Sequence, residues 1–99
     1  METNNERITP FKAFPPGETL KDELEERGIK QKDFAKQIGM QPSHLSELIN
    51  GKLAISADIA DRMENALGIP AQFWMNLQSS YELNLINIAK RSDKSRRIA

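Results

Sequence analysis

The chain has no cysteine among its 99 residues and only one histidine. The first absence excludes disulfide bonds and thiolate metal sites, and it is consistent with a reducing cytoplasm, where we expect this protein. The histidine, His44, has no partner at the spacing of a metal site. We therefore expect the protein to use neither a metal ion nor another cofactor.

Long apolar runs are also missing. No stretch approaches the roughly 18 residues of a membrane-spanning helix, and the polar N-terminus, with Glu2 and Glu6, is unlike a secretory signal peptide. With 38% hydrophobic and 28% charged residues, the composition predicts one small soluble domain around a single core. We expect no contact with a membrane.

Net charge is a third absence, because the formal charge is zero at pH 7. This argues at first against a nucleic-acid partner, but a duplex meets only one face of a protein, so the distribution matters more than the total. Residues 18–27 are mainly acidic, residues 30–52 lean basic, and residues 90–97 are clearly basic. A DNA-binding protein with so little charge should depend on dimerisation for useful affinity.

Arrangements typical of catalysis are absent as well. The sequence holds no nucleophile beside a base, no carboxylate pair in an apolar setting and no glycine-rich loop for phosphates. We therefore expect that the protein is not an enzyme.

Helical patterns are present instead, and no segment shows the alternation of a strand. Glycines and prolines delimit five predicted helices, over residues 18–26, 31–38, 42–49, 57–67 and 70 to about 90. Ser56 is the predicted N-cap of the fourth helix. The sequence therefore predicts an all-α fold with an N-terminal arm over 1–16, a domain over 17–83, and a helix end with a basic tail over 84–99.

Residues 31–50, QKDFAKQIGMQPSHLSELIN, carry the most informative pattern. A helix-turn-helix packs two helices steeply across a short turn, and this needs a small residue at the crossing, a glycine in the turn and an apolar residue after it. Ala35, Gly39 and Met40 meet these needs. Both helices must also turn apolar pairs inward, which here are Phe34 with Ile38 and Leu45 with Leu48. An ordinary helix pair shares some of these features, but their coincidence in one window favours a helix-turn-helix.

Residues 17–83 resemble the XRE helix-turn-helix family, which includes Cro and the phage repressors, and more narrowly the HigA-type antitoxins. The resemblance rests on PGE before the first helix, on ELING-K-x-x-I-S, and on ALG-x-x-A-x-FWMNLQ. Lys30 departs from the family, which usually has Ser or Thr at this cap. The resemblance implies a five-helix, lambda-repressor-like DNA-binding domain.

The resemblance also implies partners. HigA-type antitoxins bind palindromic double-stranded operator DNA as homodimers, with paired recognition helices in successive major grooves. They repress their own toxin-antitoxin operon and neutralise the toxin by direct binding. The toxin is typically an mRNA-cleaving ribonuclease of RelE-like fold. We expect the same functions of this chain.

Base contacts are predicted at the start of the second motif helix. Gln41, Ser43 and His44 can bond base edges or nearby phosphates, and Pro42 offers an apolar contact to a thymine methyl. Asn50 and Lys52 flank the turn after this helix, where side chains and backbone amides usually hold a phosphate.

Other positions of the motif are less specific. Gln31 bonds a phosphate or braces the recognition helix in such folds, whereas isolated lysines such as Lys32 and Lys36 are ordinarily solvated. Glu47 can accept from a cytosine amino group, but phosphates repel it, so a role away from the DNA is nearly as well supported. The full set predicted to contact DNA is Gln31, Lys32, Gln41, Pro42, Ser43, His44, Ser46, Glu47, Asn50 and Lys52.

Adjacent aromatic residues near the end of the domain indicate a dimer interface. Phe73 and Trp74 project about 100° apart on a helix, so one face can rarely bury both. We therefore expect part of an apolar set to contact a second copy, namely Phe73, Trp74, Leu77 and Tyr81.

Both ends of the chain carry candidate contacts. The basic residues 90–97 either attract phosphates without specificity or keep the chain in solution. The arm from Glu2 to Phe14 is a candidate toxin contact, because an arm can fold on binding.

Two other functions stay open at this point. The neutral net charge gives some support to a helix-turn-helix adaptor that binds proteins and not DNA. A solitary regulator would keep the DNA binding and have no toxin partner. A steep loss of affinity with salt would indicate a DNA-binding protein. A ribonuclease-like reading frame beside the gene would indicate the antitoxin.

Overall fold

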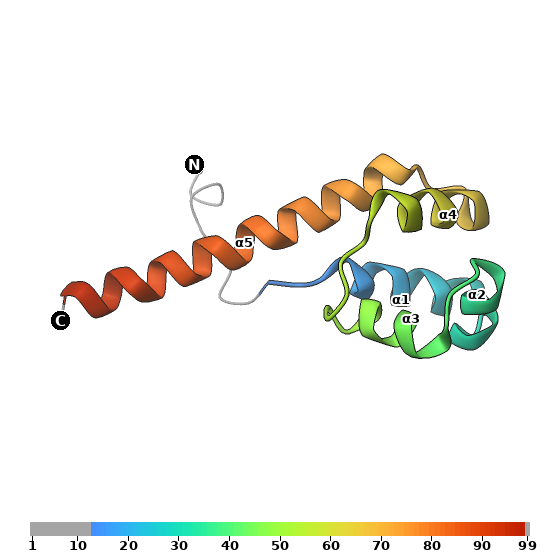
Figure 1. Ribbon diagram of the computed structural model, residues 1–99, viewed down its shortest axis with the longest axis horizontal. Helices are drawn as coiled ribbons and strands as arrows, with labels where there is room; N and C mark the ends of the chain where they lie inside the picture. Colours follow the sequence, from blue (N-terminus) through green and yellow to red (C-terminus); the bar gives the residue numbers. More distant parts are fainter. Residues whose placement is uncertain (1–12, 99) are drawn as a thin grey trace.

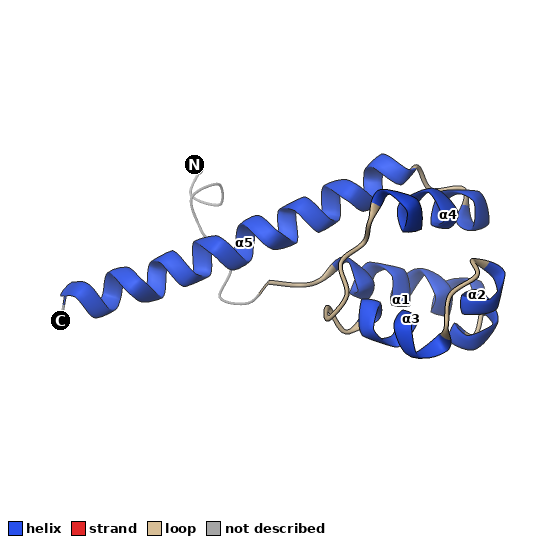
Figure 2. Ribbon diagram, in the orientation of Figure 1, coloured by secondary structure: helices blue, strands red, loops and turns tan. Residues whose placement is uncertain are grey.

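The computed structural model describes residues 13–98, with side chains described for 13–91. This part of the chain contains five α-helices and no strand (Figures 1 and 2), which confirms the all-α prediction. Among the residues that the structure describes, no helix combines the length and the apolar character needed to cross a membrane. The helices are α1 (Pro16–Arg27), α2 (Gln31–Gln37), α3 (Pro42–Ile49), α4 (Ala57–Leu67) and α5 (Ala71–Ile98).

The helices form two groups around one core. Figure 1 shows α1, α2 and α3 lying together, with α4 and the first part of α5 beside them. The apolar pairs predicted to face inward in the motif are buried, as are Leu20 and Leu24 of α1, while Met40 is only partly buried against the core. In α4 the buried residues are Ala60, Met63 and Leu67, and Ile59 is half-buried. The largest fully buried side chains are Trp74, Phe34, Leu20, Leu24, Leu45, Leu48 and Met63.

Local signals explain where most of the helices begin and end. Both α3 and α4 have the predicted bounds, and the hydroxyl of Ser56 accepts from the amide of Ile59 at 3.2 Å, which confirms the predicted cap. Lys30 makes no side-chain cap, as its chemistry predicted. The amide of Ala71 donates to the carboxylate of Glu64 at 2.8 Å, so a side chain of α4 satisfies an amide at the start of α5.

The last helix is longer than predicted. It runs to Ile98, not to about Lys90, so residues 84–98 continue α5 and do not form a separate tail. Figure 1 shows this helix projecting well beyond the other four. Three apolar side chains in its projecting part are exposed, namely Leu83 at 59%, Leu85 at 45% and Ile86 at 50%. The basic side chains after Arg91 lie outside the described residues.

Helix α1 begins at Pro16, two residues before its predicted start, and brings Gly17 against the end of α3. A methyl group added at Gly17 would collide with the Cα of Ile49 and with the carbonyl oxygen of Leu48. The backbones of α1 and α3 therefore meet directly at this position, and only glycine fits there. The sequence analysis used this residue only as part of the PGE segment before the first helix, and it missed the contact.

We expect Gly17→Ala to lower the free energy of unfolding by about 1–3 kcal/mol, because the added methyl group pushes the two backbones apart. Chemical denaturation measures this change. Helix propensity alone predicts the opposite sign, since alanine is the better helix former. An alanine variant as stable as the wild type, or more stable, would contradict the close approach.

Candidate nucleic-acid interface

Helix α3 has one buried and one exposed face. Leu45, Leu48 and Ile49 are buried in the core, and the polar residues between them are exposed. All ten residues predicted to contact DNA have exposed side chains. The inner stripe thus sets the outer face, because residues three and four apart lie on one side of a helix.

The turn before α3 is closed by backbone hydrogen bonds. Gly39 has φ 71°, a left-handed conformation that favours glycine. The amide of Gly39 donates to the carbonyl of Lys36 at 3.2 Å, and that of Met40 to the carbonyl of Ala35 at 2.8 Å. These two bonds form a Schellman motif, which ends α2 and starts the new direction of α3.

Positive charge borders the N-terminus of α3. A surface hollow of about 350 Å³ there is lined by Lys32 and Lys36, together with Gln41 and Pro42. The side chain of Gln41 does not cap the first turn, and Pro42 occupies the first helical position, where an amide would have no partner. A helix N-terminus beside two lysines attracts anions such as phosphates. The structure places Lys36 beside the start of α3, whereas the sequence analysis counted it among ordinarily solvated lysines.

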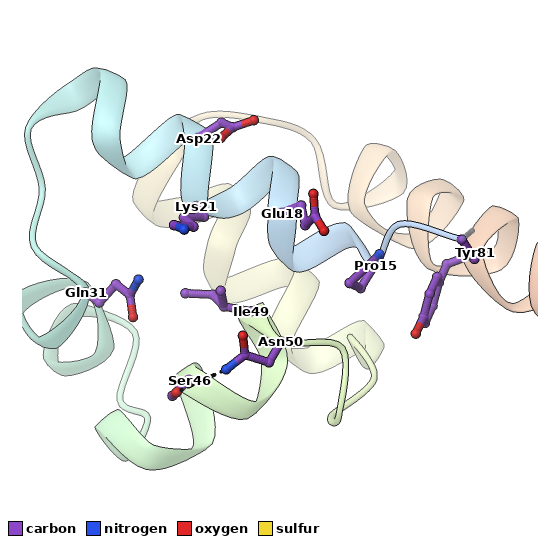
Figure 3. Close-up of a pocket in the computed structure, with 10 residues that line it drawn as sticks. Pro15, Glu18, Lys21, Asp22, Gln31, Ser46, Ile49, Asn50 and Tyr81 are labelled. Carbon is purple, nitrogen blue, oxygen red and sulfur yellow. Dashed lines mark hydrogen bonds between the residues drawn. The ribbon is translucent and has the colours of Figure 1, made fainter. Parts of the chain in front are cut away.

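A second hollow, of about 730 Å³, brings together three of the residues predicted to contact DNA. Figure 3 shows Gln31 from the start of α2 with Ser46 of α3 and Asn50, the residue that follows α3; the side-chain amide of Asn50 donates to the Ser46 hydroxyl at 3.5 Å. Helix α1 contributes Glu18 and Asp22, with Lys21 between them in sequence. The sequence analysis missed this contribution, which emerges only when α1 packs against α3. The two carboxylates disfavour a phosphate deep in this hollow.

The turn after α3 differs from its prediction in one respect. The amides of residues 50–53 all donate to carbonyls of α3, including Lys52 to Glu47 at 2.8 Å and Gly51 to Leu48 at 3.2 Å. The prediction that backbone amides here hold a phosphate is therefore wrong, because these donors end the helix instead. The side chains of Asn50 and Lys52 are exposed and remain candidates.

The aromatic pair of α5 divides between core and surface. Trp74 is 0% exposed and Phe73 is 42% exposed, with the two rings edge to face at 5.3 Å. Trp74 therefore cannot contact a second copy, and its prediction as an interface residue is wrong. Leu77 and Tyr81 are half-buried and line a hollow between α5 and the start of α1.

Comparison with known proteins agrees with this geometry. A helix-turn-helix family model matches residues 20–74. The antitoxin HigA-1 of Vibrio cholerae is 40% identical over 78 residues, which are 78% of this chain and 73% of that protein.

Solved structures give the same assignment. A candidate antidote protein of a plasmid maintenance system from Nostoc punctiforme has a TM-score of 0.81 at 31% identity, covering 87% of this chain and 97% of that one. The antitoxin HigA of Pseudomonas aeruginosa, solved with the higBA promoter, has a TM-score of 0.75 at 32% identity, covering 89% and 97%. With its exposed recognition helix and these relatives, the chain belongs to the helix-turn-helix family of DNA-binding regulators and, within that family, to the HigA-type antitoxins.

Proposed function

We propose that this protein binds its own operator as a homodimer in the cytoplasm, represses the operon there and neutralises a partner ribonuclease toxin by direct binding. The observation that carries the DNA-binding part is the exposed polar face of α3, fixed by the burial of its apolar face. The structural relative solved with promoter DNA supports it.

In this proposal the N-terminal half of α3 reads base edges. Gln41, Ser43 and His44 lie on its exposed side and supply donors and acceptors in the major groove. We propose that Lys32 and Lys36, which lie beside the helix start, and the exposed Lys52, which follows its end, contact phosphates on the two sides. Phosphate contacts set register and orientation, and the α3 side chains supply the sequence preference.

We expect the pair Gln41→Ala and Ser43→Ala to weaken operator binding by about 5- to 150-fold per lost base contact, and to change binding to scrambled DNA very little. Fluorescence titration of the purified protein against its own upstream DNA and a scrambled duplex, at two salt concentrations, measures both.

The comparison variant is Lys52→Ala, which removes a proposed phosphate contact and no proposed base contact. It should weaken binding to both duplexes equally and reduce the slope of log affinity against log salt by about one. Weak binding of the wild type, equal on the two duplexes, would contradict the repressor and favour a protein adaptor.

A homodimer would place two recognition helices about one turn of DNA apart. The exposed apolar residues of the projecting part of α5 supply a surface through which the two copies could contact each other. We therefore propose an interface in which part of the exposed set Leu83, Leu85 and Ile86 joins the predicted Phe73, Leu77 and Tyr81, without Trp74.

We expect Leu85→Lys with Ile86→Lys to convert a dimer into a monomer of 11.2 kDa, since each apolar side chain withdrawn from an interface costs about 1.5–3 kcal/mol. Light scattering after size exclusion gives the mass. The matched variant Asn76→Lys adds charge to an exposed site of α5 without removing apolar surface, and it should stay dimeric. A dimer that survives the double substitution would contradict the α5 interface.

The toxin surface remains a proposal, and the candidate arm, Glu2 to Phe14, lies largely outside the described residues. We expect the neighbouring reading frame to encode a small basic ribonuclease of RelE-like fold. Co-expression should give a complex that purifies intact and lacks ribonuclease activity. A neighbouring gene of another kind, and full repression by the antitoxin alone, would favour a solitary regulator.

A further inference from the structure

Arg62 of α4 reaches across to the turn that precedes the recognition helix. Its Nη1 donates to the carbonyl oxygen of Ile38 at 3.1 Å and to that of Gly39 at 3.5 Å. Its Nη2 pairs with Asp58 of the same helix at 2.9 Å, which orients the guanidinium. The last carbonyls of a helix have no partner within it, so the arginine completes the end of α2 and ties the turn to α4.

Gln78 of α5 makes a corresponding contact with the segment that follows α3. Its side chain is buried, at 7% exposure, and its Oε1 accepts from the amide of Ile55 at 2.9 Å. Its Nε2 donates to a carboxylate oxygen of Glu82 at 2.9 Å. Ile55 is also buried, at 2% exposure, and an unpaired amide there would be costly. The glutamine therefore fixes the loop between α3 and α4 on α5.

These two contacts flank α3 in the chain. Helix α3 packs mainly against α1 and α2, and α4 packs mainly against α5. Apolar packing is not directional, so burial alone leaves a short helix some freedom to rotate or slide. Hydrogen bonds have narrow geometry, and those of Arg62 and Gln78 join the α4–α5 pair to the segments on either side of α3.

We propose that Arg62 and Gln78 are positioning residues, which hold the recognition helix at both ends in the orientation that operator DNA requires. This inference rests on the proposed DNA binding and assigns its specificity to two side chains away from the exposed face of α3. It also gives a role to the last residue of the FWMNLQ motif, Gln78, which entered the sequence analysis only through resemblance.

The variants Arg62→Met and Gln78→Met remove the hydrogen bonds and keep much of the side-chain volume. Each should lower affinity for the operator by about 10-fold or more, as when a base contact is lost. Binding to scrambled DNA and the salt slope should stay unchanged, because neither residue is assigned to a phosphate. Titrations are made at a temperature at which circular dichroism shows each variant fully folded.

The chain supplies a matched control for each substitution. Arg27 pairs with Glu23 four residues away at 3.0 Å, with an exposure close to that of Arg62 (36% against 43%), but lies at the end of α1. Gln72 bonds Asn76 on the surface of α5. Arg27→Met and Gln72→Met should leave the ratio of operator to scrambled affinity as in the wild type.

An exchanged pair separates positioning from general stability. Gln78→Glu alone faces the carboxylate of Glu82 and should reduce the affinity ratio. Adding Glu82→Gln restores a donor–acceptor pair between the two side chains while keeping an acceptor for Ile55, and should restore the ratio. Hydrogen exchange of the Ile55 amide should be slow in the wild type and in the exchanged pair, and faster in Gln78→Met.

Folded Arg62→Met and Gln78→Met proteins that discriminate as well as their controls would overturn the positioning role. An equal loss on operator and scrambled DNA would also overturn it, because it indicates general damage to the DNA-binding surface. If Gln78→Met does not fold, Arg62→Met and the exchanged pair decide. A wild type that binds both duplexes alike would overturn the proposed function itself, and the inference with it.

Discussion

The structure depends on the burial of one face of a very short helix. Helix α3 has eight residues, and isolated helices below about 12 residues are marginal in water. Its order must come from tertiary contacts, namely Leu45, Leu48 and Ile49 in the core and the close approach of Gly17. Each other helix supplies part of this support, either by direct packing or through the segments on either side of α3. The polar face of α3 is exposed because the opposite, apolar face is buried in the core.

Much of this organisation was predictable because its signals are local. The bounds of α3 follow from Pro42 and from the glycine turn after Ile49, and those of α4 from Ser56 and Gly68. The inward stripes follow from helical periodicity. The candidate DNA contacts within α2 and α3 are exposed for the same reason, since a residue outside the stripe of a short amphipathic helix faces solvent.

What the sequence could not supply depends on contacts between distant segments. The sequence analysis correctly expected that Phe73 and Trp74 would not both be buried on one face of the helix. Only the packing of α5 decides that Trp74 is buried and Phe73 is exposed. The role of Gly17 requires the position of α3, and the carboxylates near Gln31 require that of α1. The full length of α5 was missed because the basic residues 90–97 suggested a tail.

A small change in the angle between α4 and α5 would displace the distant residues of α5, because the displacement grows with distance along the helix. Helix α5 has 28 residues, so at 1.5 Å per residue it is about 42 Å long. The last residue of the proposed interface, Ile86, lies about 22 Å along the helix from Ala71, so a tilt of about 5° at the start would move it by about 2 Å, more than half the rise of one base pair. The bond from Ala71 to Glu64 sits at that start. In a dimer joined through the projecting part of α5, one hydrogen bond would thus help to set the operator spacing that the two recognition helices can span.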